Sequence, residues 1–495
     1  MFDRAPGGDN YTPVAAPALV YELGHAIAVK IGAGLTGEFY VASVLQNLLV
    51  WLSACLLYHT LRTMRLQRHA GFIALSFLVC VLSTTLAQAF WSETTALSLM
   101  SVTLFIVAVM RDRPPTSRRG QWALGLACGL SVGLLVVTRM TPILLIPGIA
   151  WLLFRRLPRW QVVQFTGTVT AVTALLLLAA VVANHVRYGR FELTNSSGRH
   201  LWQGVKDIAD RALAGSSEYQ TLKALNQQLQ GKDWWDIRVP DNQHSTADPR
   251  DPILARLATQ AIRNAPGLYL QQGARNFVAT VGTAPWRLDV TRGQWNPLQR
   301  ERMLPPLADL LHAPRVYVSA VDMGLQGVYF LFERLYPFTI FGIAATLVAM
   351  VARVTPRSAA GSSWPRRKSG TAVVVILGGA LLEAIPLARF GFNWKGGAAC
   401  VACAVMLGWF ARLTSEESSG RDGTDAATDT ARFFIPLAAM FFGSLWFSWQ
   451  VEIANTRNTV PYLPLWAALL ALAGSYWHDV RRARVGMARV GVSEA

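Results

Sequence analysis

The chain has few charged residues for its length. Only 15% of its 495 residues are charged, whereas 52% are hydrophobic. Its mean hydropathy of +0.31 is typical of integral membrane proteins. This composition argues against a water-soluble globular domain and predicts a protein embedded in a lipid bilayer.

Cysteine and metal-ligand patterns are also scarce. All five cysteines fall inside apolar segments, so no disulfide framework is expected: Cys55, Cys80, Cys128, Cys400 and Cys403. The last two form a CxxC without a second ligand pair, which favours small-residue helix packing over metal or redox chemistry. His185, His200 and His244 lack ligand spacing, so no structural metal is predicted.

Acidic residues are outnumbered, 29 against 46 basic ones, giving a net charge of +17. The basic residues gather in short loops beside apolar segments, which indicates membrane topology rather than nucleic-acid binding. These loops contain Arg62, Arg65 and Arg68; Arg111, Arg113, Arg118 and Arg119; Arg155, Arg156 and Arg159; Arg353, Arg357, Arg366, Arg367 and Lys368; and Arg481, Arg482, Arg484 and Arg489.

Eleven apolar stretches have roughly the length of a membrane span. They lie at 39–61, 72–90, 94–110, 121–138, 141–154, 161–184, 323–352, 371–388, 396–412, 432–450 and 460–478. The positive-inside rule places the basic loops in the cytoplasm and therefore places 185–320 on the opposite side. The predicted fold is an all-α polytopic membrane bundle of about eleven spans. Its parts are an N-terminal membrane region with the first outer loop (1–184), an extracytoplasmic region (185–320) and a C-terminal membrane region (321–495).

The predicted topology leaves the segment before the first span on the outer side of the membrane. A first span at 39–61 that runs inward leaves about 38 residues outside with no anchor, so we expect one further helix encoded upstream of Met1.

The outer segment has helical spacing at Ile253, Leu257 and Ala261, with a break expected at Pro266. It predicts a small cap of interfacial helices. The acidic stretch 413–430 predicts a solvated cytoplasmic loop, and no transporter-type repeat is evident.

Five segments of the sequence, taken in chain order, together resemble a known family of enzymes. They are LSTTLAQAFWSETTALSLMSVTLFIVAVMRDR, GLACGLSVGLLVVTRMTPILLIPGIAWLLFRR, RYGRFELTNSSGRHLWQG, AIRNAPGLYLQQGARNF and NTRNTVPYLPLWAALLAL. Together they resemble the helix pairs, outer stretch and last spans of bacterial GT-C membrane glycosyltransferases. The closest patterns are the protein mannosyltransferase-like and lipid A aminoarabinose transferase-like enzymes.

That resemblance implies a transferase in the plasma (inner) membrane with its site on the non-cytoplasmic face. It would move a sugar from a polyprenyl-phosphate donor to a glycan, lipid or protein acceptor, by direct displacement that inverts the anomeric centre. The planar guanidinium of arginine can donate hydrogen bonds to the phosphate as it leaves. A carboxylate is needed to take the proton from the acceptor hydroxyl. In the family an acidic residue of the first outer loop is that base. Asp3 and Asp9 lie in this loop; Asp9 is the candidate, unless it is a solvated aspartate and the base lies upstream.

Other candidate residues stand at predicted outer helix ends. The resemblance points to Glu93 as a site residue. A carboxylate at a membrane boundary is costly unless it is paired or faces a cavity, and helix capping or an ion pair is the alternative to a role in the site. Arg139 breaks the positive-inside trend and so needs a local reason; phosphate contact is favoured over a structural pair with Glu93 or an interfacial anchor. Arg457 and Tyr462 occupy another outer helix mouth and are candidates for the same phosphate.

Weaker candidates for substrate contact are Asn195, Ser196, Gly198, Arg389 and Lys395. A polar turn explains the first three equally well, and interfacial snorkelling explains the last two slightly better. Trp234 and Trp235 are better explained as interfacial residues than as a sugar platform.

Two other functions remain open. One is a lipid-linked polysaccharide polymerase or ligase, and the other is a transporter or flippase, which would need charge through the whole membrane depth. The sequence names neither the sugar nor the acceptor. It implies no cofactor and leaves a divalent metal requirement open.

Overall fold

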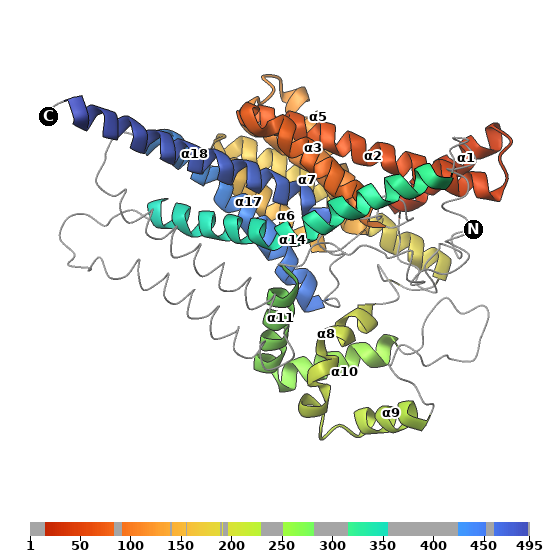
Figure 1. Cartoon of the computed structure of the whole chain (residues 1–495). Helices are drawn as coiled ribbons and strands as arrows, with labels where there is room; N and C mark the ends of the chain where they lie inside the picture. Colours follow the sequence, from red (N-terminus) through yellow and green to blue (C-terminus); the bar gives the residue numbers. More distant parts are fainter. Residues whose placement is uncertain are drawn as a thin grey trace, which may run out of the picture.

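The computed structural model describes residues 15–83, 92–138, 141–154, 156–188, 191, 197–228, 251–281, 315–354, 424–451 and 460–493. Within them every regular element is a helix. In chain order these are α1 (Ala15–Lys30), α2 (Leu35–Thr63), α3 (Gln67–Ser83), α4 (Ser92–Asp112), α5 (Arg118–Thr138), η2 (Thr141–Leu144), α6 (Leu145–Phe154), α7 (Arg159–Tyr188), α8 (Ser197–Ala212), α9 (Ser217–Gln228), α10 (Asp251–Asn264), α11 (Pro266–Val281), α14 (Arg315–Val354), α17 (Thr424–Val451) and α18 (Leu463–Ser493). Figure 1 shows the long helices packed together and α8–α11 gathered below them.

Six of the described helices are long and apolar enough to cross a membrane. Their apolar segments are Val44–Thr63, Glu93–Asp112, Arg118–Thr138, Arg159–Val186, Gly327–Met350 and Val460–Arg482. A segment of about 20 residues in a helix is about 30 Å long, which matches the hydrocarbon core of a bilayer. These helices indicate a membrane protein.

The eleven expected spans are confirmed only in part. Three further stretches are helical but have shorter apolar segments, at Gln67–Leu82, Leu145–Phe154 and Phe433–Leu445. The expected spans 371–388 and 396–412, and residues 413–423 of the expected loop 413–430, lie outside the described residues. The end of that loop was wrongly predicted, because α17 begins at Thr424 and makes 424–430 helical. The count of eleven therefore stays a prediction.

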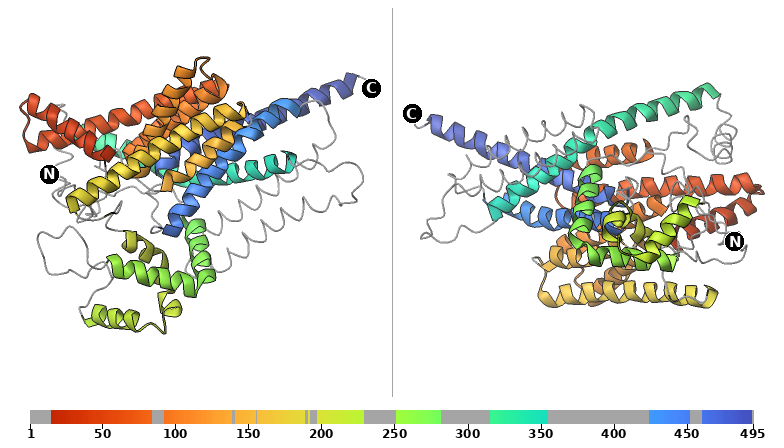
Figure 2. Two further views of the ribbon diagram at one scale, coloured as in Figure 1. Left: turned by 180° about the vertical axis from the view of Figure 1, so that it is seen from behind. Right: turned by 90° about the horizontal axis from the view of Figure 1, so that it is seen from below.

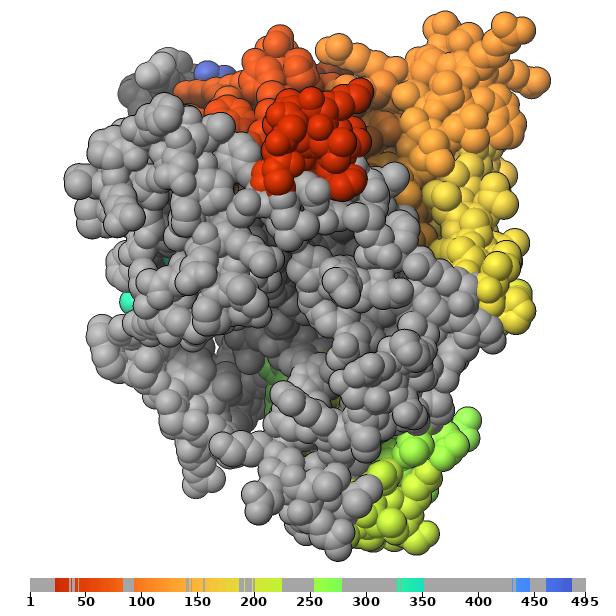
Figure 3. Space-filling model, turned by 90° about the vertical axis from the view of Figure 1, so that its right-hand side faces the viewer, coloured from red at the N-terminus to blue at the C-terminus, as the bar shows by residue number. Residues whose placement is uncertain are grey.

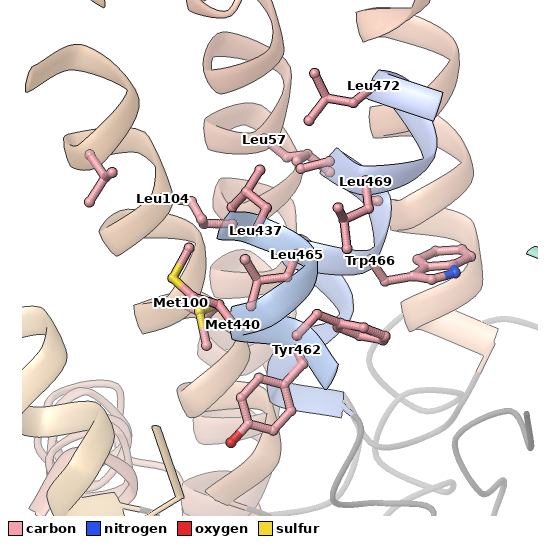
Figure 4. Close-up of a cluster of buried hydrophobic side chains, with 14 of the residues drawn as sticks. Leu57, Met100, Leu104, Leu437, Met440, Tyr462, Leu465, Trp466, Leu469 and Leu472 are labelled. Carbon is pink, nitrogen blue, oxygen red and sulfur yellow. The ribbon is translucent and has the colours of Figure 1, made fainter. Parts of the chain in front are cut away.

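Helix α4 lies at the centre of the bundle. In the apolar segments of α4 and α18, 78% of the residues are buried, whereas in the segment of α7 only 22% are buried. Met100 and Leu104 of α4 belong to one large apolar core with residues of α2, α17 and α18 (Figure 4). The outer helix α7 instead exposes side chains such as Leu175 and Leu178, as expected of a helix that contacts lipid.

Helices α5 and α7 approach closely along a row of glycines. A Cβ atom built on Gly129 would lie 2.7 Å from the Val172 Cβ, and one on Gly133 would lie 2.5 Å from the Leu176 Cδ1. Glycine at every fourth position leaves one face of α5 without side chains, so the two backbones can pack together as in other membrane helix pairs.

The expected helical cap contains a separate core. Helices α8 and α10 bury Trp202, Val205, Leu254 and Leu257 against one another. The expected break is confirmed, because α10 ends at Asn264 and α11 begins at Pro266. We call α8–α11 the cap unit; two of its helices, α8 and α11, contact α17.

The first helix corrects the expected outer loop. Residues Ala15–Lys30 form α1, which packs along α2. A Cβ atom on Gly24 would lie 2.7 Å from the Ala42 Cβ, so this contact is tight. The helix has only 16 residues and is too short to be recognised as a span, which is why a search for span-length apolar stretches missed it.

Candidate functional site

Three of the basic loops meet at one end of the bundle. Arg65, Arg111 and Arg156 all interact electrostatically with Asp112, the last residue of α4. The guanidinium of Arg111 also lies 4.0 Å from the ring centre of Phe433, near the start of α17. We call this the arginine end. It is the end that the positive-inside rule assigns to the cytoplasm.

The cap unit and the start of α4 lie at the other end, the cap end. Glu93 is about 20 residues before Asp112, so roughly 30 Å of helix separates Glu93 from the arginine end. Figure 2 shows from behind that the cap unit lies on one side of the bundle. In the space-filling view the yellow-green surface of the cap unit is at the bottom, and the orange surface around the turn between α4 and α5 is at the top (Figure 3).

Most of the predicted site residues lie outside the described residues. These are Asp9, Arg139, Asn195, Ser196, Arg389, Lys395 and Arg457. Glu93, Gly198 and Tyr462 are described, and each takes part in at least one hydrogen bond, ion pair or other electrostatic or ring contact. Their roles in binding or catalysis stay predictions.

Glu93 is a buried carboxylate in the first turn of α4, with only 1% of its surface exposed. The helix dipole favours a negative charge at this position, by about 0.3–1 kcal/mol at exposed sites and more where the group is buried. A carboxylate so deeply enclosed at a membrane boundary requires a polar environment, because its desolvation is costly.

Tyr462 lies at the start of the last long helix. It is 1% exposed, and its side chain joins the apolar core beside Leu465. Its hydroxyl points away from the leucine cluster of α18 (Figure 4). Gly198, in the first turn of α8, is buried. The expected helix mouth at Tyr462 is therefore a closely packed position in this structure.

A row of polar side chains runs between α2 and α4. The Ser53 hydroxyl donates to the Ser98 hydroxyl at 3.1 Å, and the Ser98 hydroxyl lies 3.3 Å from the Leu49 carbonyl oxygen, which accepts from it. Nearer the cap end the row continues with Gln46 of α2 and Thr95 of α4, which are 1% and 4% exposed. We call Gln46, Ser53, Thr95 and Ser98 the α2–α4 polar seam.

The cap-end half of this seam has unsatisfied polar atoms. In the described part of the structure, Gln46 Oε1 and Thr95 Oγ1 are buried and accept or donate no hydrogen bond. Such an atom costs about 1–3 kcal/mol, so native proteins contain few of them. Gln46 and Thr95 were not among the residues predicted from the sequence. Polar residues such as Asn47 and Ser53 also occur in the same apolar stretch as Gln46, so sequence position alone does not single it out.

The cap unit carries its own charged contacts. Asp210 accepts hydrogen bonds from the Tyr219 hydroxyl, at 2.8 Å, and from Lys223. These donors lower the pKa of the Asp210 carboxyl below its usual value. Burial and the neighbouring Asp210 raise the pKa of the Tyr219 phenol, so it remains a hydrogen-bond donor at physiological pH. This network joins α8 to α9, with Tyr219 buried in the cap core and Asp210 and Lys223 at the surface, which suits a structural role.

Metal ligation has no candidate among the described residues, where no three His, Cys, Asp or Glu side chains form a set that would hold an ion. Comparisons with protein-family models, curated protein sequences and solved structures gave no match.

Proposed function

We propose that this protein is a membrane glycosyltransferase that moves a sugar from a polyprenyl-phosphate donor to an acceptor at the cap end of the bundle. The observation that carries the proposal is Glu93, a buried carboxylate at the membrane boundary of the central helix, at the end remote from the arginine loops. A transporter would need charged groups at several depths, whereas the described buried carboxylate lies at one boundary. The resemblance to GT-C enzymes supplies the reaction.

The proposed chemistry assigns one task to each charged group. Arg139 and Arg457 hold the donor phosphate and stabilise the charge that develops as it leaves. The acceptor oxygen attacks the anomeric carbon, the bond from that carbon to the phosphate oxygen breaks, and polyprenyl phosphate departs as the anion. Asp9, or an acidic residue upstream of Met1, takes the acceptor proton. Glu93 orients one of the arginines or a substrate hydroxyl.

The test is sugar transfer in reconstituted vesicles with a polyprenyl-phosphate sugar donor. Arg139→Ala, Arg457→Ala and Glu93→Gln should each lower the rate by tens- to thousands-fold, since losing a buried charged contact costs on the order of 2–5 kcal/mol. Arg118→Ala and Arg119→Ala are the matched controls, because these exposed arginines begin α5, at the arginine end. Rates like the wild type in all three site variants would refute the assignment.

A further inference from the structure

We propose that the cap-end half of the α2–α4 polar seam is a binding site for hydroxyl groups of a glycosyl ligand, with Gln46 and Thr95 as its contact residues. The choice of a glycosyl ligand rests on the proposed function. The site itself rests on two buried polar atoms that have no hydrogen-bond partner in the described part of the chain, Gln46 Oε1 and Thr95 Oγ1.

The register of the two helices places these residues at one level. Both helices run toward the arginine end, because Arg65 follows α2 and interacts with Asp112 at the end of α4. The Ser98 hydroxyl bonds to the Leu49 carbonyl, which sets Ser98 of α4 beside Leu49 of α2. Gln46 and Thr95 are each three residues earlier, which is about 4.5 Å along each helix axis. They therefore lie at the same depth, nearer the cap end.

Helical spacing also places them on the contacting faces. Gln46 precedes Ser53 by seven residues, close to two full turns, so both belong to the face of α2 that packs on α4. Thr95 precedes Ser98 by about one turn and shares its side of α4. The deeper half of the seam is satisfied by the Ser53–Ser98 bond, and the half nearer the cap end is not. A ligand with hydrogen-bonding groups would complete this set of hydrogen bonds.

The polar atoms select the chemistry of the ligand. An amide oxygen accepts hydrogen bonds, and a threonine hydroxyl both donates and accepts. The two unpartnered atoms are therefore one acceptor, Gln46 Oε1, and one hydroxyl that can take either role, Thr95 Oγ1. Sugar hydroxyls supply the matching donors, whereas a phosphate group offers only further acceptors and negative charge. We therefore assign this side of the site to the hydroxylated part of the donor or acceptor, and not to the phosphate.

The inference is tested by direct binding, without catalysis. Purified protein in lipid nanodiscs is titrated with radiolabelled n-octyl glycosides of glucose, mannose and galactose, below their micelle concentrations. The variants are Gln46→Met and Thr95→Val, which keep side-chain size and remove the polar atoms. Thr173→Val is the matched control: Thr173 is 2% exposed with an unpartnered Oγ1, but it lies on α7.

We expect saturable binding of at least one glycoside to the wild type and to Thr173→Val, and a Kd at least tenfold higher in each seam variant. The ligand-free seam variants should unfold at the wild-type temperature or above, because Gln46 Oε1 and Thr95 Oγ1 have no hydrogen-bond partner in the described part of the chain. No saturable binding to the wild type, or equal Kd values in the seam variants, would overturn the inference. So would a tenfold loss of n-octyl phosphate binding in both variants.

The outcomes separate the inference from the proposed function. Glycoside binding through Gln46 and Thr95 without transfer from any polyprenyl-phosphate donor would uphold the seam and refute the transferase. Transfer that depends on Glu93, together with unchanged glycoside binding in Gln46→Met and Thr95→Val, would uphold the transferase and refute the seam as a glycosyl site.

Discussion

Asp210 lies at the surface of the cap unit with two donors, Tyr219 and Lys223, on its carboxylate. Because these donors lower its pKa, the charged form is favoured in the folded protein. The contribution to stability is complete above the unfolded pKa of about 4 and is lost as the pH falls through the lower folded value. The carboxylate is two-thirds exposed, so solvent screening reduces this contribution to below about 1 kcal/mol.

We therefore predict that Asp210→Asn accelerates amide hydrogen exchange in α8 and α9 modestly at pH 6, and that the difference from the wild type shrinks as the pH falls below the unfolded pKa of about 4. Hydrogen exchange read by mass spectrometry on the whole protein measures this difference at each pH. Asp207→Asn is the control, because its carboxylate accepts from Gln272 of α11, whereas Lys223 donates to Asp210. A difference that grows as the pH falls would contradict the assigned sign.

Some of the buried polar residues at the cap end could be predicted from the sequence, and others could not. Glu93 could be placed at a helix start near the membrane boundary from its position between two apolar segments, and the structure describes it there. Gln46 and Thr95 were not selected, because each is a common polar residue in an apolar run. Only helix packing shows that both are buried at the same depth, with Gln46 Oε1 and Thr95 Oγ1 lacking hydrogen-bond partners among the described residues.

Among the elements, α5 and α7 are joined by a contact that depends on the absence of side chains. The Gly129→Ala substitution would place a Cβ atom 2.7 Å from the Val172 Cβ and 3.2 Å from the Val169 Cα. We predict a loss of about 1–3 kcal/mol in unfolding free energy, the usual cost of overpacking. Unfolding in mixed detergent micelles measures it.

The matched control is Gly167→Ala on α7. A Cβ atom at Gly167 meets no atom of the described residues within 4 Å, so this substitution should leave stability unchanged or raise it through helix propensity. Equal stability of the two variants would show that the glycine row is not what brings α5 and α7 together.

The sequence predicted elements best where one physical signal dominated. Apolar length located α4, α5 and α7, and the fixed backbone of Pro266 located the boundary between α10 and α11. It failed for α1, whose 16 residues are too few for a span and which is held by packing on α2. Packing between distant segments is not encoded in any local pattern, so such helices need the structure.

At the scale of the whole molecule, two ends with different chemistry organise the protein. Arginines from three loops surround Asp112 at one end, and the cap unit, Glu93 and the unsatisfied half of the α2–α4 polar seam lie toward the other. The central claim is that these ends face opposite sides of a membrane and that chemistry belongs to the cap end.

Labelling of single introduced cysteines with a membrane-impermeant maleimide tests this claim most directly. Ala214→Cys reports on the cap unit and Arg118→Cys on the arginine end; both positions are exposed. The unsubstituted chain is the control for its own cysteines. We predict that Ala214→Cys is labelled in intact cells and that Arg118→Cys is labelled only after the membrane is permeabilised. Labelling of Arg118→Cys in intact cells, with Ala214→Cys protected, would contradict the topology and the site assigned to the cap end.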